Sequence, residues 1–384
     1  MINASIAFKE ALISPISEVY VKLELLDHNE NLLSTITQQV SSDSIGDISV
    51  DKTRDIRRMF TLPINNKDGT FVWGENNLIW MDNKRVKLYI GLKTPNGIEY
   101  VPEGVFVLTQ PEATHKIGQN TITLNGQDKM YLLTGNFGKF THITTINKGT
   151  NITEAIKIVA TEGGIDKLLL QQTDITLPYD LTYQIDQNRS QSIKELAEKA
   201  VWDVYFDVNG YLRFEPFKDP LVDPSCWSYK VEDITLYAGS TRKLDDTTLF
   251  NHILVMGGSS DVAEFRTELI IDNTLPEWAN HPYSIQNIGD RLFCWNDGNP
   301  DSNIDTQSQC DARAIYELNK NLVYSEKVSI DMAPNYLHEA NDIIEVVDSE
   351  NGCIGTYQLE QFSIPIKPKI TTSEAVKINH ISTS

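Results

Sequence analysis

The chain has 384 residues, of which 40% are hydrophobic and 22% are charged, a composition typical of folded rather than disordered proteins. Its formal net charge of −20 argues against a conventional nucleic-acid binder, because affinity for phosphates comes from a surplus of lysine and arginine. An acidic balance favours solubility, and it also suits a passage through which other polyanions move without sticking. The charge alone does not choose between these two roles.

The length predicts two or three domains, since a single hydrophobic core stops growing at about 250–300 residues. No run of about 18 apolar residues occurs, so we expect no transmembrane helix. The N-terminal segment is too polar for a signal peptide, and we expect synthesis in a cytoplasm. Four cysteines lie in the C-terminal half without a C-x-x-C pair, and we expect them to be reduced and mostly buried: Cys226, Cys294, Cys310 and Cys353.

Residues 1–145 are dominated by short runs rich in β-branched and aromatic residues, which favour strands. These runs are residues 19–26, 59–64, 85–92, 98–101, 105–108 and 121–124. Asn96-Gly97 stands between two of them, and this dipeptide predicts a tight hairpin because both residues tolerate positive φ. Many short strands with turn signals between them predict an N-terminal β-barrel domain.

Residues 146–224 change to a mixed pattern. Asn151 and Glu154 have the spacing of a capping box, and Gly163-Gly164 would end the helix that follows. A second helix is predicted to begin near Ser190 or Ser192, and Asn209-Gly210 predicts another hairpin after it. The apolar faces of the two helices are Ile152, Ala155, Ile156 and Val159, and Ile193, Leu196, Ala197, Ala200 and Val201. We interpret this region as a small α+β insert domain.

Residues 225–384 return to strands, at 250–258, 328–332, 342–347 and 355–364. One helix is expected at residues 306–321, with Cys310, Ala314, Ile315 and Leu318 as its apolar residues. The predicted fold class is therefore mainly β with an α+β insert. Two β-barrel domains would flank a small α+β module.

Several segments together carry a family resemblance. SVDKTRDIRR at residues 49–58, YVPEGVFVLT at 100–109 and GQDKMYLL at 126–133 resemble the N-terminal barrel of phage tail hub proteins. Residues 197–216 are similar to the central module of that family, and residues 250–257 and 334–347 to its second barrel. The resemblance is strongest to the tail-tip hubs of phages and prophages of Gram-positive bacteria. It extends to the central hub of contractile baseplates and of type VI secretion spikes.

This resemblance implies a structural virion protein of the tail tip or baseplate, assembled in the host cytoplasm. Three chains would form a homotrimeric ring that joins the six-fold tail tube to a three-fold spike or fibre. The ring would pass the tape-measure protein and DNA without binding the DNA. The expected partners are the distal tail or tail tube rings and the spike or fibre protein. Some family members continue into a cell-wall peptidase or fibre-like region, and we expect any such digestive part to be on another chain.

No catalytic or cofactor-binding motif stands out. The seven histidines form no H-x-H or H-E-x-x-H, and neither a G-x-S-x-G elbow nor a phosphate-binding glycine loop follows a strand. Paired acids such as Asp245-Asp246 or Glu232-Asp233 are interpreted as solvated surface, because adjacent acids arise by chance among 53. We therefore predict no enzyme activity, no cofactor and no metal.

One loop is a weak calcium candidate, because oxygen-bearing side chains occupy alternate positions: Asp297, Asn299, Asp301, Asn303 and Asp305. Ser302 replaces the usual glycine and Ser308 replaces the usual bidentate glutamate, so a polar turn is the favoured interpretation.

Tryptophans offer the remaining alternative. Trp73 and Trp80 lie in a Gly/Asn-containing loop and could stack on sugars, which would make the chain a host-surface carbohydrate-binding adhesin. Trp202 follows an apolar helix face and is expected in the core. A cell-wall hydrolase subunit is a less favoured third possibility, since it needs two carboxylates at a defined separation.

Overall fold

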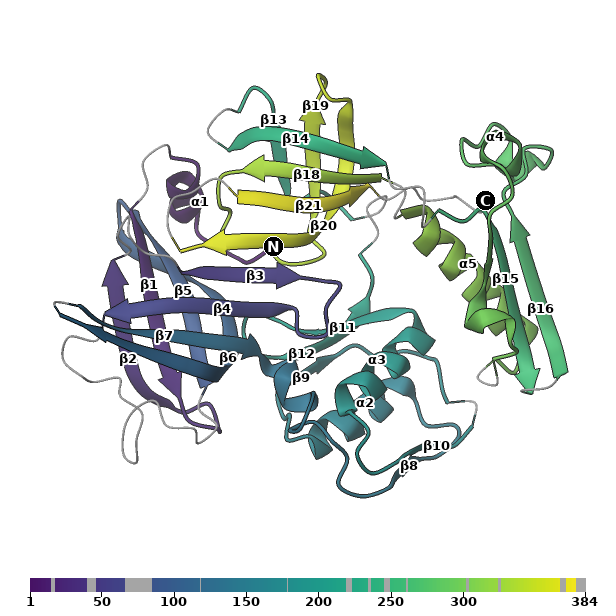
Figure 1. Cartoon of the computed structure of the whole chain (residues 1–384), viewed down its shortest axis with the longest axis horizontal. Coiled ribbons are helices and arrows are strands. Elements are labelled where there is room, and N and C mark those ends of the chain that lie inside the picture. Colours follow the sequence, from purple (N-terminus) through teal and green to yellow (C-terminus); the bar gives the residue numbers. More distant parts are fainter. Residues whose placement is uncertain are drawn as a thin grey trace.

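The computed structural model describes residues 1–14, 18–39, 46–65, 85–117, 119–177, 179–218, 223–233, 236–244, 249–259, 262–301, 304–323, 326–366 and 371–377. Within these residues the chain is mainly β, as predicted, and apart from one short helix near the N-terminus the α-helices lie in two units beside the large sheet (Figure 1). No helix in the described ranges is long and apolar enough to cross a membrane.

A single 13-stranded sheet joins the two ends of the chain. Its strands run in the order β14-β18-β21-β20-β3-β4-β7-β6-β5-β1-β2, with β13 paired to β19 and β19 to β20. The N-terminal strands are β1 (Val19–Leu26), β2 (Leu32–Gln39), β3 (Asp47–Asp51), β4 (Arg58–Asn65), β5 (Arg85–Thr94), β6 (Gly97–Lys116) and β7 (Gln119–Asp128). The C-terminal strands are β13 (Trp227–Lys230), β14 (Tyr237–Leu244), β18 (Glu326–Met332), β19 (Ile343–Asp348), β20 (Cys353–Pro365) and β21 (Thr371–Lys377).

The two β regions meet where β3 pairs with β20, which lie side by side in Figure 1. Alternating burial along β1, β3 and β4 places one face of each strand in a shared apolar core, since side chains alternate across a strand. Helix α1 (Ile6–Leu12), capped by the Ser5 hydroxyl, buries Phe8 and Leu12 in the same core. No closed barrel is found among the described strands, and the sheet passes from one region into the other.

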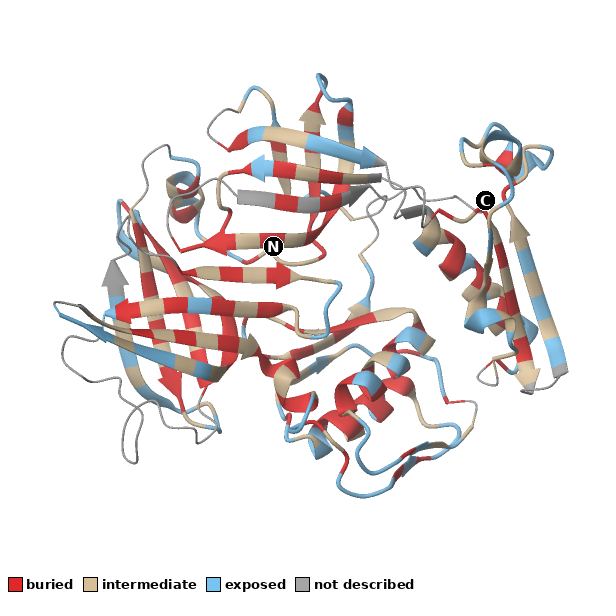
Figure 2. Ribbon diagram, in the orientation of Figure 1, coloured by how far each residue is buried: buried red, intermediate tan, exposed pale blue. Residues whose placement is uncertain are grey.

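The insert has a core of its own. Helices α2 (Ile152–Glu162) and α3 (Arg189–Ala200) pack together over the three-stranded sheet of β9 (Leu168–Leu170), β11 (Trp202–Phe206) and β12 (Leu212–Pro216). The 3-10 helix η1 (Lys129–Leu133) leads into the insert, and β8 (Thr144–Ile146) pairs with β10 (Leu181–Tyr183). Red buried positions line the inner faces of both helices in Figure 2.

A third apolar core lies inside the region that was predicted to be one barrel. Strands β15 (His252–Ser259), β16 (Val262–Ile270) and β17 (Leu292–Cys294) form a separate sheet covered by α5 (Gln307–Val323). The short helices η2 (Pro276–Trp278), α4 (Ile285–Ile288) and η3 (Trp295–Gly298) complete it. This unit is drawn in green, apart from the large sheet, in Figure 1. Residues 249–323 are therefore a second insertion, between β14 and β18.

Candidate functional site

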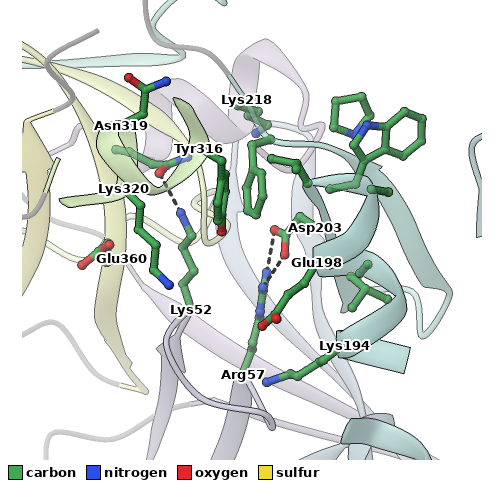
Figure 3. Close-up of a pocket in the computed structure, with 18 residues that line it drawn as sticks. Lys52, Arg57, Lys194, Glu198, Asp203, Lys218, Tyr316, Asn319, Lys320 and Glu360 are labelled. Atoms are coloured by element: carbon green, nitrogen blue, oxygen red, sulfur yellow. Dashed lines mark hydrogen bonds and ion pairs between the residues drawn. The ribbon is translucent and has the colours of Figure 1, made fainter. Parts of the chain in front are cut away.

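A cavity of about 680 Å³ lies where the large sheet, the insert and α5 meet, and we call it the junction cavity (Figure 3). The turn after β3 contributes Lys52 and Arg57, and the insert contributes Glu198, Asp203 and Lys218 among others. Tyr316, Asn319 and Lys320 come from α5, and Gln358 and Glu360 from β20. The cavity therefore marks the point at which four segments distant in sequence converge.

A buried ion pair forms one wall of the junction cavity. Arg57 Nη2 lies 2.5 Å from Asp203 Oδ1, and Nη1 donates to Oδ2 at 3.0 Å. The amide of Asn341 donates to the same Oδ2 at 2.5 Å. The carboxylate of Asp203 therefore binds side chains from two other parts of the chain. Burial alone would raise the pKa of Asp203, but the charge and hydrogen bonds of Arg57 outweigh it and hold the pKa below its usual value.

Lys52, from the same turn as Arg57, also lines the junction cavity. Its Nζ donates to Gln358 Oε1 at 2.7 Å, and its backbone N–H donates to the carbonyl of Glu360. Burial lowers the pKa of Lys52, partly offset by the charges of Asp203 and Glu360. The cavity wall thus joins the turn after β3 to β20 by polar bonds.

A second polar cluster surrounds Asp342, to which Lys218 of the junction cavity is ion-paired. Asp342, whose side chain is fully buried, accepts from Lys218 Nζ at 3.0 Å and from the Met1 amino group at 2.6 Å. His338 Nδ1 lies 3.4 Å from the other carboxylate oxygen, and the Glu339 N–H donates to that oxygen at 3.0 Å. Burial would raise the pKa of Asp342, but the hydrogen bond from His338 and the nearby positive charges hold it well below its usual range.

Cys226, His338 and Asp342 form the one group of three metal-type ligands found in the described ranges. Sequence reasoning missed it, because 112 residues separate Cys226 from His338 and no motif links them. His338 Nε2 is already bonded to the Tyr229 hydroxyl at 2.8 Å. Burial raises the pKa of the Cys226 thiol to about 12, with the charge of Asp342 adding to it, so the thiol is protonated at neutral pH.

Cys226, His338 and Asp342 have the residue types of a catalytic triad, in which a thiol is the nucleophile, a histidine the base and an acid orients the histidine. Their environment differs from that of such a triad. A nucleophilic thiol needs a depressed pKa and access for a substrate. Cys226 has the opposite shift, His338 is fully buried, and none of the described cavities is lined by either residue. The arrangement can stabilise the chain around Asp342 through the ion pairs and hydrogen bonds of that carboxylate.

The calcium candidate lies in the green unit. Asp297 stands in η3 with φ 52°, Asp301 accepts from the indole N–H of Trp295 at 3.0 Å, and the Asp305 N–H donates to Gln309. Asn299 donates its amide to the carbonyl of Asn296. Asn303 lies outside the described residues, so the loop stays a weak calcium candidate, with a polar turn as the favoured interpretation.

Of the other residues considered in the sequence analysis, some lie outside the described residues and some inside them. Trp73, Trp80, Asp245 and Asp246 lie outside the described residues. Glu232 and Asp233 follow β13, where the Asp233 backbone closes a turn with Lys230 and Leu236. Trp202 is half-buried rather than fully in the core: it packs on Phe214 with ring centres 4.9 Å apart and lines the junction cavity.

Comparison with known proteins identifies similar folds among solved structures but no family related by sequence. No protein-family model matches, and the search of curated proteins finds no significant relative. Among solved structures, a tail protein from Neisseria meningitidis aligns with a TM-score of 0.63 at 11% identity, over 93% of this chain and 96% of that one. The 43 kDa tail protein of prophage MuSo2 from Shewanella oneidensis gives 0.60 at 12% identity, over 94% and 98%.

Two further structures extend this comparison. A prophage tail protein from Listeria monocytogenes aligns with a TM-score of 0.54 at 12% identity, over 95% of this chain and 96% of that one. A chain of the Francisella PdpA-VgrG complex gives 0.54 at 10% identity, and the match covers 96% of this chain but 53% of that one. The chain therefore has the fold of phage and prophage tail proteins along nearly its whole length.

Proposed function

We propose that the chain is a non-enzymatic structural component of a phage tail tip or baseplate. The observation that carries this proposal is the extent of the shared fold. Two proteins described as tail proteins match over more than nine-tenths of both chains. A fold alone does not define a function, but no reaction site was found in the described residues that would suggest a different one.

In this proposal the chain forms a homotrimeric hub ring. Three copies, each with two β regions, would present six similar units to a six-fold tail tube and a three-fold face to a spike or fibre. The net charge of −20 supports a lumen that passes the tape-measure protein and DNA without gripping the DNA. The particle would be assembled in the host cytoplasm and carry the hub at its tail tip.

The domain division also belongs to the proposal. Residues 1–145 and 225–384 would be the two barrel domains and 146–224 the insert. The third apolar core, at residues 249–323, supports treating the C-terminal domain as interrupted by a module of its own. The shared sheet supports a rigid wall segment, because β3–β20 pairing couples the two regions directly.

Light scattering across a concentration series tests the ring. The proposal expects the mass to rise to three times the 43.4 kDa of one chain as concentration increases. A strict monomer at the highest soluble concentration would count against a self-assembling hub.

A further inference from the structure

A further cavity, of about 850 Å³, lies between the insert and the second insertion, and we call it the inter-insert cavity. Its insert side is formed by α3 and by the residues around Tyr179. Its other side is formed by η3, by the chain that follows η3 and by α5. The volume is near the upper end of the about 300–1,000 Å³ range of small-molecule sites, so the cavity has room for a drug-sized organic ligand.

Two helices contribute polar side chains to the inter-insert cavity. Glu198 and Lys199 of α3 follow Glu195 by three and four residues, a spacing that places all three on one face of the helix. On α5, residues 308–309 and 312–313 are likewise four apart. The apolar faces of the two helices are buried in the cores of their own units. Each helix therefore presents a polar face to the space between the units.

Aromatic rings line the inter-insert cavity from both sides. Tyr179 comes from the insert, and Lys199 Nζ donates to its hydroxyl at 3.2 Å. Trp295 comes from the second insertion, where its indole N–H donates to Asp301 at 3.0 Å and the Arg313 guanidinium lies 3.4 Å from its ring centre. These contacts fix both side chains. Both are half-buried, so part of each ring stays open to the cavity.

Three polar side chains have hydrogen-bonding capacity that the described part of the chain does not use. The Glu195 carboxylate accepts no hydrogen bond there, and the Ser308 hydroxyl makes none. Gln309 accepts the Asp305 N–H at 2.9 Å with its Oε1, which leaves its amide N–H groups as donors. Burial raises the pKa of Glu195, and the charge of Lys199 offsets part of the effect. Donors and acceptors are therefore both available to a ligand.

The backbone is strained on both sides of the inter-insert cavity. Val201, which ends α3, has φ 59°, and Asn296 in η3 has φ 54°. A β-branched residue is rarely found at such a φ, because its side chain crowds the backbone. Strain of this kind clusters at ligand sites, where it is retained because it positions neighbouring groups. Val201 ends the helix that carries Glu195, and Asn296 directly follows Trp295.

We propose that the inter-insert cavity binds a neutral saccharide. A sugar ring has an apolar C–H face and hydroxyls that both donate and accept hydrogen bonds, so it matches aromatic surface bordered by mixed polar groups. The rings of Tyr179 and Trp295 would contact the apolar face. Glu195 would accept hydrogen bonds from sugar hydroxyls, and Ser308 and Gln309 would donate to them. Carboxylate and ammonium groups occur together on α3, which favours an uncharged ligand. This site goes beyond the proposed tail function and does not depend on it.

Isothermal titration of the intact chain with maltotriose and with the β-1,4-linked trimer of N-acetylglucosamine tests the proposal. Sorbitol, an open-chain polyol without a ring face, is the blank. Saturable binding of at least one trisaccharide at one site per chain is expected. Binding of neither trisaccharide, or equal heat from sorbitol, overturns the proposal. That result would leave the tail function untouched, because the tail function rests on the fold.

Tyrosine variants locate the binding site. Tyr179→Ala should weaken trisaccharide binding at least roughly tenfold, because apolar contact with the sugar is lost. Tyr179→Phe keeps the ring and should retain most of the affinity. Tyr211→Ala is the matched control, since Tyr211 is also half-buried and has Lys167 Nζ 5.8 Å from its ring centre, as Lys199 Nζ is 5.7 Å from that of Tyr179. Equal affinities of the two alanine variants would overturn the assignment.

Glu195→Gln separates recognition from a structural role. Glu195 accepts no hydrogen bond in the described part of the chain, so this variant should change the melting temperature little. It should weaken trisaccharide binding roughly tenfold, because a charged acceptor makes a stronger hydrogen bond than a neutral one. Glu154→Gln, at an exposed glutamate of α2, is the control and should leave binding unchanged. Parent-like affinity of the Glu195→Gln chain would contradict the assignment, and this comparison decides if Tyr179→Ala does not fold.

Discussion

Ile364 of β20 and Ile48 of β3 face each other across an antiparallel ladder, although 316 residues separate them in the sequence. Both side chains are buried, at 1% and 0% exposure. Phe362 and Val50, two positions along, extend the same contact. The N-terminal and C-terminal β regions therefore share one core along the β3–β20 pairing, which we call the seam. The large sheet is continuous across this seam.

Truncation at the seam should destabilise both β regions together. Ile48→Ala is expected to cost about 2–5 kcal/mol, the range for deleting buried aliphatic groups. Ile354→Ala, at a side chain 55% exposed on β20, is the control and should change stability little. Denaturant unfolding followed by tryptophan fluorescence and circular dichroism measures both variants. Separate transitions for the two β regions in the parent chain would contradict a shared core.

The Arg57–Asp203 pair should matter more than an exposed pair of the same type. Arg57→Met leaves Asp203 buried without its charge partner, and breaking such a pair costs about 3–5 kcal/mol. Arg54→Met breaks the Arg54–Asp51 pair, which is 2.9 Å long but has an arginine 61% exposed, and should cost less than about 1 kcal/mol. Urea unfolding compares them. Equal losses would show that Arg57 does not tie the insert to the sheet.

Asp128 should make stability depend on pH. It accepts backbone N–H groups of Arg58 and Met130, both at 2.9 Å, but burial raises its pKa from 3.8 to about 6. Between these values the folded chain binds more protons than the unfolded chain, so this contribution to stability is complete below pH 3.8 and is lost as pH rises through 6.

The free energy of unfolding should fall by about 3 kcal/mol over this range, because each unit of difference between the folded and unfolded pKa of Asp128 contributes about 1.4 kcal/mol. Asp128→Asn retains one acceptor oxygen and cannot titrate, so it should not show the loss. Urea unfolding of both chains at pH 4, 5, 6 and 7 measures the difference, and groups elsewhere cancel in the comparison. A stability difference that is constant over this range would contradict a raised pKa for Asp128.

Cys226 should be chemically inert. Its thiol is protonated at neutral pH because burial raises its pKa to about 12, and only the thiolate reacts with alkylating reagents. Iodoacetamide at pH 8 should leave Cys226 unmodified in the native chain and modify it after denaturation, as read by peptide mass spectrometry. Rapid native alkylation of Cys226 would mean that the cluster with His338 activates the thiol.

Local features of the fold could be predicted from the sequence. The residue pattern gave the bounds of β1 correctly, the hairpin at Asn96-Gly97 was confirmed, and α2 begins after Asn151, whose side chain accepts from the Thr153 N–H. These features depend on contacts between near neighbours, and propensity and turn chemistry report such contacts. Ile315 is an exception: it was expected on the apolar face of the helix that became α5, and its side chain is 39% exposed.

The long-range features could not be predicted. Pairing of β3 with β20 joins segments whose sequences carry no signal for each other, and the separate core at residues 249–323 looks like ordinary strands and one helix in the pattern. The junction cavity needs Lys52, Asp203, Tyr316 and Gln358 to be brought together from four segments. Only the tertiary fold determines which polar side chains converge, and periodicity contains no information about it.

Immunogold labelling of intact phage particles tests the central proposal most directly. Antibodies raised against the purified chain should label the distal end of the tail, at one position per particle, and should not label heads or the length of the tail tube. Gold along the tube, or particles that carry no label although the denatured protein is detected in them, would contradict a hub at the tail tip.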